Sequence, residues 1–196
     1  MPLVVKGIGF NSAMTFAERE SSERGVHEAL ERLGRERGLS YEERRLTSGS
    51  IELAAAAAAW HAVYELAGGT KKEPARSYFQ RMGRFIAVSN LSSIYRGVLQ
   101  LIGSPTMMAK RVPMLWQTYF PGVRVESNTS EVKGGHYTDR VYGFEGTPYI
   151  GAVAEGWLHY AFDLVGAREL SVNEEATARG ELAATGPLAY RILWRG

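Results

Sequence analysis

Residues 81–116 read RMGRFIAVSNLSSIYRGVLQLIGSPTMMAKRVPMLW, and this pattern is typical of tandem amphipathic helices separated by a stop. Apolar side chains recur at helical spacing on both sides of Gly103-Ser104-Pro105, where glycine ends one helix and Ser-Pro begins the next. We expect the first helix to break near Ser89-Asn90 and to resume up to this stop. The second helix is expected to reach about Phe120 and to bend at Pro113, because proline lacks an amide donor and crowds the preceding turn.

The region before this stretch is also predicted to be helical. Val4-Val5 favours a short strand, and Ser21-Ser22 is placed to cap a helix that Gly38 ends. An alanine-rich helix is expected to open at Ser50 and to end at Gly68-Gly69. Capping-box sequences, in which a Ser or Thr is followed three residues later by a Glu, occur at residues 40–43 and 70–73.

The alanine run within Leu53–Trp60 has two interpretations. Six consecutive alanines favour a helix and present little side-chain volume on any face. One interpretation is close packing against neighbouring helices. The other is that one face borders a cavity and leaves room for a ligand.

The pattern changes after Pro121-Gly122, where apolar and polar residues begin to alternate. We expect strands and one inserted helix in the order of a hairpin, a helix and two further strands, at residues 123–126, 136–145, 147–165, 168–178 and 187–194. The helical part, about residues 11–120, would pack on an antiparallel sheet of about four strands within residues 121–196. This segregation predicts an α+β fold in a single domain, residues 1–196.

Composition narrows the class of protein. Apolar residues make up 45% of the 196 residues, as in ordinary globular domains, and the net charge of +2 is too small to indicate a nucleic-acid partner. The chain has no cysteine, which excludes disulfides and thiolate chemistry. No apolar run approaches the roughly 20 residues that span a bilayer, and the N-terminus lacks a signal-peptide pattern. We therefore expect a cytoplasmic protein without a membrane span.

Two long segments, residues 81–116 and 148–194, resemble a paralogous family of uncharacterised, myxobacterial-type proteins of about this length. The matching pieces in this sequence are Val5-Lys6-Gly7, Gly83-Arg84, Leu91, Ile94-Tyr95-Arg96, Leu101, Gly103-Ser104-Pro105, Leu115-Trp116, Tyr119-Phe120, Gly156-Trp157-Leu158, Gly166-Ala167, Ala178-Arg179-Gly180-Glu181 and Trp194. The resemblance implies a bacterial protein that forms a two-fold homodimer.

That family is in turn similar to the group of 4-vinyl reductase, haem–nitric-oxide-binding and vesicle-tethering domains. The resemblance implies a helical layer over an antiparallel sheet, with a ligand cavity between the two. The 4-vinyl reductase type has cysteines in its last hairpin, whereas Thr177–Glu181 here has none. The haem-binding type has a Tyr-x-Ser-x-Arg signature, and the nearest string, Tyr137–Arg140, has a different spacing. We therefore predict no haem, no other cofactor and no metal.

Candidate catalytic residues are few. The four histidines are too far apart in sequence to form a metal-binding pair. His61 and His159 are the candidates for acid–base chemistry, and Asp139 and Glu155 are candidate carboxylate partners. The alternative is that both histidines are ordinary helix residues at or near the surface.

The aromatic and methionine residues suggest an apolar binding pocket. The candidate ligand-binding residues are Tyr95, Met107, Trp116, Tyr119, Trp157 and Tyr160. An ordinary aromatic core is the other interpretation, and the sequence does not separate the two. If a cavity exists, we expect it between the helices and the sheet, near Tyr95, Trp116 and Trp157.

Three hypotheses about function follow. The first is a small-molecule-binding sensory or regulatory domain for signalling, which holds an apolar or aromatic ligand and performs no chemistry. The second is an enzyme of specialised metabolism that acts on a hydrophobic substrate through the histidines and carboxylates. The third is a protein–protein interaction module.

Overall fold

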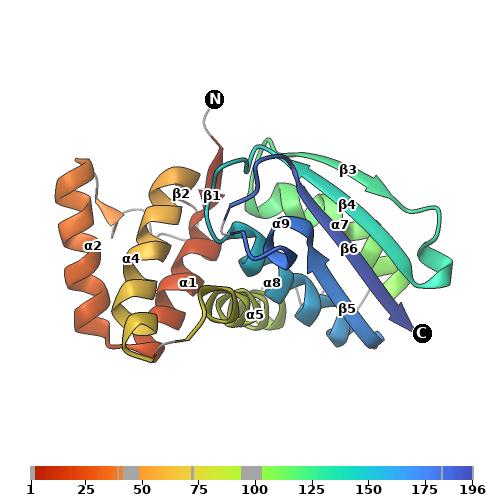
Figure 1. The fold of residues 1–196 in the computed structure, drawn as a ribbon, viewed down its shortest axis with the longest axis horizontal. Coiled ribbons are helices and arrows are strands. Elements are labelled where there is room, and N and C mark those ends of the chain that lie inside the picture. Colours follow the sequence, from red (N-terminus) through yellow and green to blue (C-terminus); the bar gives the residue numbers. More distant parts are fainter. Residues whose placement is uncertain are drawn as a thin grey trace.

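The chain forms a group of helices at one end and a four-stranded antiparallel sheet at the other, as the computed structural model shows (Figure 1). The structure describes residues 3–38, 40–41, 49–71, 73–93, 103–181 and 183–195. The helical part contains β1 (Val4–Lys6), α1 (Gly7–Glu20), α2 (Glu23–Arg37), β2 (Ser50–Glu52), α4 (Leu53–Lys71), α5 (Ala75–Ser93) and α7 (Pro105–Tyr119). The rest contains β3 (Arg124–Asn128), η1 (Val132–Gly134), β4 (His136–Tyr142), α8 (Ile150–Leu164), β5 (Arg168–Glu174), α9 (Glu175–Ala178) and β6 (Leu188–Arg195).

The sheet has the strand order β3-β4-β6-β5, and all neighbouring strands are antiparallel. Strand β6 alternates between buried and exposed residues, so that Leu188, Tyr190, Ile192 and Trp194 share the inner face as the sequence predicts. The helix α8 contacts β5, and α7 contacts β3, on this side of the sheet. The α+β class with an inserted helix is therefore confirmed.

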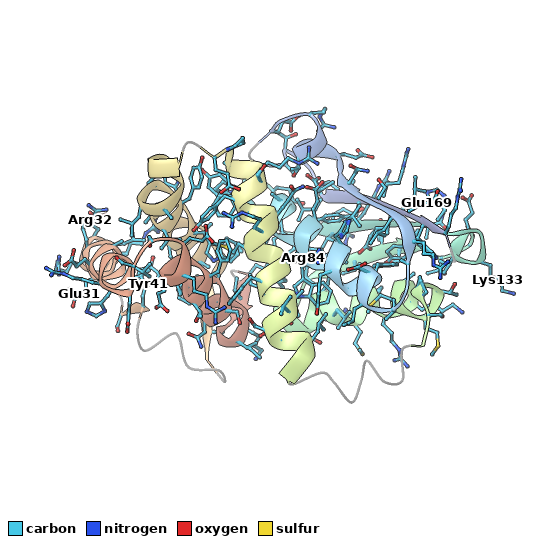
Figure 2. The ribbon with its side chains drawn as sticks, turned by 90° about the horizontal axis from the view of Figure 1, so that it is seen from below. Glu31, Arg32, Tyr41, Arg84, Lys133 and Glu169 are labelled. Atoms are coloured by element: carbon cyan, nitrogen blue, oxygen red, sulfur yellow. The ribbon has the colours of Figure 1, made fainter. Side chains whose placement is uncertain are left out.

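Helices α1, α2 and α4 form the end of the molecule away from the sheet, with α5 beside them (Figure 1). Figure 2 shows α5 crossing the middle of the molecule with Arg84 on it, between Glu31 and Arg32 at the helical end and Lys133 and Glu169 at the sheet end. Helix α5 thus connects the two parts of the fold.

Several predicted helix ends are confirmed. Ser22 caps α2 by accepting a hydrogen bond from the amide of Gly25 at 3.1 Å, and Gly38 ends this helix in the left-handed conformation with φ of 63°. Ser104 caps α7, which contains Pro113 and ends at Tyr119, close to the predicted Phe120. The bend at Pro113 stays a prediction.

The start and end of the alanine-rich helix were predicted wrongly. Ser50 belongs to β2 and pairs with Lys6 of β1. Its backbone is therefore part of a strand, and α4 begins at Leu53 instead. The helix also continues through Gly68-Gly69 to Lys71. A glycine costs a helix only about 1 kcal/mol, which tertiary packing can offset.

The two capping boxes and the break at Ser89-Asn90 also have different outcomes. Thr70 lies inside α4, so residues 70–73 do not cap the next helix, and most of residues 40–43 lie outside the described residues. Helix α5 runs unbroken through Asn90, which is buried and accepts a hydrogen bond from the Ser12 hydroxyl of α1 at 3.1 Å. The predicted continuation over residues 94–102 lies outside the described residues.

The strand predicted at residues 168–178 is shorter, because Glu174 turns the chain. Its carboxylate accepts hydrogen bonds from the amides of Ala176 at 3.2 Å and Thr177 at 2.7 Å, and so it begins the short helix α9. Residues 175–178 are therefore helical rather than extended.

Two glycines set the distance between α5 and α8, which make the most extensive contact between any two elements of the described chain. A Cβ atom at Gly83 of α5 would overlap the carbonyl oxygen of Val153, and one at Gly156 of α8 would overlap the carbonyl oxygen of Gln80. Both obstacles are backbone atoms, which cannot rotate away as a side chain can. The two helices therefore cross with their backbones in contact, and only glycine allows this at either position.

We predict that Gly83→Ala lowers the free energy of unfolding by about 3 kcal/mol or more, at the upper end of overpacking effects, because the helices must separate to admit the methyl group. Chemical denaturation monitored by circular dichroism measures this change. Gly134→Ala is the matched control, because nothing lies within 4 Å of a Cβ atom there. Equal stability of the two variants would contradict the proposed backbone contact.

Candidate functional site

An apolar cavity lies among α1, α4, α5, α7 and α8, beside β1. Its volume is about 60 Å³, and only apolar atoms face it. The lining residues are Val5, Gly9, Trp60, Ile86, Val112, Leu115, Trp116, Tyr119, Phe120, Ile150, Val153, Ala154, Trp157 and Leu158. No acidic or basic side chain belongs to this set. The described part of the wall therefore offers no charged group for catalysis.

Three tryptophans from three helices dominate the wall. Trp60 follows the alanine run of α4, Trp116 lies near the end of α7, and Trp157 lies in the middle of α8. Their side chains are 2%, 6% and 9% exposed, so the burial predicted for Trp157 from its apolar helix face is confirmed. Indole rings are large and rigid, and they hold a cavity open because they cannot fold into small gaps.

The cavity lies beside Trp116 and Trp157, as the sequence predicted, but not between the helices and the sheet. It is enclosed by helices and β1, and none of its lining residues belongs to the four-stranded sheet. The inner face of the sheet is instead filled by its own side chains against α7 and α8, as in the contact of Trp194 with Phe162 at 5.3 Å between ring centroids. The alanines of α4 are also absent from the described wall, although most of the alanine run is buried, and α4 contacts α1 and α2.

Trp116 connects the cavity to the sheet through a buried carboxylate. Its indole Nε1 donates a hydrogen bond to Asp139 Oδ2 at 3.0 Å, and the Ser127 hydroxyl donates to Asp139 Oδ1 at 2.9 Å. The Tyr137 hydroxyl in turn donates to Ser127 Oγ at 3.0 Å. Asp139 is 1% exposed, and this burial raises the pKa of its carboxyl group to about 6, although the hydrogen bonds it accepts act in the opposite direction.

The residues predicted to bind a ligand fall into three groups. Trp116, Tyr119 and Trp157 line the cavity, and Tyr119 meets Trp157 edge to face with 5.6 Å between ring centroids. Met107 is 43% exposed on α7, and Tyr160 lies under the guanidinium of Arg84 at 5.4 Å, so neither belongs to the wall. Tyr95 lies outside the described residues.

The candidate catalytic residues do not converge. His61 is exposed on α4, and its Nδ1 lies 2.9 Å from the Tyr149 hydroxyl. His159 is half-buried on α8, and neither histidine lines the cavity. Glu155 is buried elsewhere, where Gln80 donates to it at 2.8 Å and Arg76 pairs with it at 3.2 Å. Within the described ranges, no three histidine, aspartate or glutamate side chains are grouped as a metal site would require.

Tyr149 is held in an uncommon backbone conformation at the start of α8. Its φ of 68° is left-handed, which costs energy for a residue with a side chain. Its ring stacks on Phe79 with 4.1 Å between centroids and also on His61, and these contacts hold it in place. Burial raises the pKa of its hydroxyl, so it stays protonated beside His61 and is a weak nucleophile.

The sequence analysis did not predict most of the wall, and two of the residues that it did not assign to the site are central to it. Trp60 was named only as the end of the alanine run, and Asp139 only as a possible catalytic partner. A signal for Asp139 was present, because it alternates with Tyr137 and Val141 on one face of a strand, and a carboxylate at such a position needs a buried partner. The identity of that partner, Trp116, depends on how α7 packs on the sheet.

Comparison with known proteins places the fold. No protein-family model matches the chain, and no curated protein is significantly similar to it. Solved structures do match. An H-NOX protein from S. oneidensis in the Fe(II)NO ligation state has a TM-score of 0.67 at 12% identity, covering 97% of this chain and 99% of that one. The Fe(II) unliganded H-NOX protein from K. algicida has a TM-score of 0.64 at 12% identity, covering 97% of each chain. The chain therefore has the H-NOX fold.

The interior does not fit the haem that this fold implies. Haem iron is held by histidine, cysteine, methionine or tyrosine. The chain has no cysteine, and none of the four histidines and five methionines that the structure describes lines the cavity. Among these types, only Tyr119 belongs to the described wall, and the neighbouring tryptophans occupy the space around it. Counted from Tyr137, moreover, Asp139 and Val141 stand where the haem-binding signature has Ser and Arg.

No helix among the described residues is long and apolar enough to cross a membrane.

We predict that the buried carboxyl group of Asp139 makes the protein less stable as pH rises. Its pKa is about 6 in the folded protein against an ordinary value of 3.8, so the folded protein holds a proton that the unfolded chain has released between these values. Two pKa units correspond to about 3 kcal/mol. Between pH 4 and pH 7, the free energy of unfolding should therefore fall by about 3 kcal/mol more in the wild type than in Asp139→Asn.

Urea denaturation of both proteins across this pH range measures the difference. The asparagine side chain would keep an acceptor for Trp116 and would not titrate, which makes it a close isostere. Parallel pH profiles for the two proteins would show that Asp139 titrates normally.

Proposed function

We propose that this protein is a small-molecule-binding domain that holds a compact, uncharged, apolar ligand in the cavity among its helices. The single observation that carries the proposal is the cavity wall, which combines three large tryptophan rings with aliphatic side chains and no charged residue. Ligand pockets are commonly mostly apolar and lined by aromatic side chains. The H-NOX fold supports the proposal, because the H-NOX protein in the Fe(II)NO state is itself a ligand-bound protein.

The volume of the cavity limits the size of the ligand. At about 60 Å³ it exceeds the roughly 15 Å³ that one water molecule needs, and it is smaller than the roughly 150 Å³ cavity that admits benzene. Water gains nothing from a wall without polar atoms, so the site favours an apolar molecule. A compact ligand of about four to six non-hydrogen atoms suits this space, and an aromatic ligand would require the tryptophans to move.

A sensory role is supported by the position of Trp116. Its ring faces the cavity, and its nitrogen bonds Asp139 of β4, so a ligand that displaces the ring also strains a buried hydrogen bond of the sheet. Binding inside the helices would in this way alter the sheet without any catalytic step. A regulatory domain works in this way when its ligand stabilises one of two conformations of the protein.

The binding proposal is tested by thermal unfolding in the presence of methylenecyclobutane, a compact hydrocarbon. A ligand that binds only the folded protein adds about 2.7 kcal/mol at one hundred times its dissociation constant, and so raises Tm. Ala154→Leu should remove this response, because Ala154 lines the cavity and leucine fills it. Ala54→Leu is the matched control, since the same change falls on an exposed position of α4. A response that survives in Ala154→Leu would place the ligand elsewhere.

The proposal also predicts that the protein does not form a stoichiometric haem complex. Neither the described cavity wall nor residues 94–102 offer a histidine, cysteine or methionine ligand. Titration with haemin, followed by absorption spectroscopy, should give no sharp Soret band that saturates at one haem per chain. Such a band, lost in Tyr119→Phe, would show that the interior opens around a haem and that Tyr119 holds it.

An enzymatic function is the second candidate, because His61 and Tyr149 form a hydrogen-bonded pair at the surface. This pair is separate from the cavity, and the raised pKa of Tyr149 does not favour proton transfer at neutral pH. If the pair were catalytic, His61→Ala would abolish turnover while leaving the hydrocarbon response intact.

The third hypothesis, a protein–protein interaction module, has weaker support. The large apolar side chains that are exposed in the described chain are spread over four elements, α5, α7, α8 and β6: Val88, Met107, Met114, Leu164 and Leu193. Single exposed apolar residues are normal on protein surfaces.

We further propose that the chain is a cytoplasmic bacterial protein of the paralogous family named above, that it acts in signalling, and that it is a homodimer. These proposals rest on the sequence resemblance and on the frequency of two-fold symmetry among oligomers. Light scattering on the purified protein measures the mass of the particle directly.

A further inference from the structure

Two of the tryptophans in the cavity wall have a buried indole N–H without a hydrogen-bond partner among the described residues. These are Trp60, which is 2% exposed, and Trp157, which is 9% exposed. The third tryptophan of the wall, Trp116, differs because Asp139 accepts its N–H at 3.0 Å. Of the three indole N–H groups in the wall, one thus has a hydrogen-bond acceptor and two have none among the described residues, and the three lie on separate helices.

Unsatisfied buried donors are rare in folded proteins, because each loses its hydrogen bonds to water and gains nothing in exchange. If the wall served only to exclude water, phenylalanine or leucine would serve as well at these two positions without that penalty. Two such donors border one cavity, and they come from α4 and α8, which are remote in sequence. This coincidence indicates a partner that the protein itself does not provide.

We infer that the ligand of this cavity carries a neutral hydrogen-bond acceptor, such as a ketone, ether or nitrile group, which receives the N–H of Trp60 or Trp157. The inference rests on the proposed function and narrows its ligand class. The acceptor is uncharged, because no cationic side chain belongs to the described part of the cavity wall and an unpaired carboxylate would be strongly destabilised there. The remainder of the ligand is apolar, to match the rest of the wall.

The geometry requires a small adjustment on binding. In this structure only apolar atoms face the cavity, so the indole nitrogens lie behind the surface of the wall. The inference therefore requires that one of these rings rotates about its side-chain bonds when the ligand binds, so that its N–H reaches the cavity. The rotation breaks no hydrogen bond among the described residues, in contrast to Trp116, whose rotation would break its bond to Asp139.

The test compares two probes of equal shape, cyclobutanone and methylenecyclobutane, which differ only in an oxygen atom in place of a CH₂ group. The four tryptophans give four indole N–H resonances in a ¹H–¹⁵N spectrum of the wild-type protein, assigned with single Trp→Phe variants. Cyclobutanone should move the Trp60 or Trp157 resonance downfield, as a new hydrogen bond does, and methylenecyclobutane should not. The Trp194 resonance is the internal control, because Trp194 does not line the cavity.

Dissociation constants from the same titrations provide a second measurement. The ratio of the two affinities should shift against cyclobutanone by about three- to tenfold in Trp60→Phe or Trp157→Phe, the effect of losing one hydrogen bond. Trp194→Phe should leave the ratio unchanged. The wild-type spectra decide the question even if a variant fails to fold.

The outcomes separate this inference from the proposed function. Binding of both probes with equal effects on the indole resonances would overturn the acceptor inference and leave the apolar binding site intact. Failure of both probes to bind, in spectra and in thermal unfolding, would overturn the binding site and the inference with it. A cyclobutanone-specific shift of Trp60 or Trp157 that Ala154→Leu removes would support both.

Discussion

The backbone contact between α5 and α8 is the constraint on which the rest of the structure depends. Gly83 and Gly156 each face a backbone carbonyl of the other helix, so no side chain larger than hydrogen fits between them. Because α5 packs on α1 and α8 packs on β5, this crossing joins the helical end to the sheet. It also places Ile86 of α5 and Trp157 of α8 on the same cavity. The relative positions of these two wall residues therefore depend on two glycines that are not themselves among the described lining residues.

The second organising interaction is the bond between Trp116 and Asp139. A buried carboxylate is costly, and here it is retained with its pKa raised and with donors from α7 and β3 directed at its two oxygens. Removing either donor would leave one carboxyl oxygen of Asp139 buried without that hydrogen bond. The bond therefore orients one wall of the cavity and ties it to the sheet. The indole N–H groups of the other two tryptophans, Trp60 and Trp157, have no hydrogen-bond partner among the described residues.

The likeness to H-NOX structures illustrates that a fold and its cofactor are separate properties. The whole chain follows the H-NOX fold, yet the interior of the described part offers no histidine to an iron atom, and large indole rings take up the space. A change of lining residues on one scaffold is enough to change the class of molecule that it can bind.

The sequence by itself determined the class of fold and most of its elements, because these depend on local patterns. The alternation in β6, the cap at Ser22 and the Gly-Ser-Pro start of α7 were all correct, and so was the burial of Trp157. Local patterns failed at Ser50 and Asn90, where a strand partner and a hydroxyl from α1 overrode them. Only the tertiary structure decided where the cavity lies, that Trp60 lines it and that Asp139 receives the N–H of Trp116. Each of these depends on residues far apart in sequence, which come together only when the helices pack on one another and on the sheet.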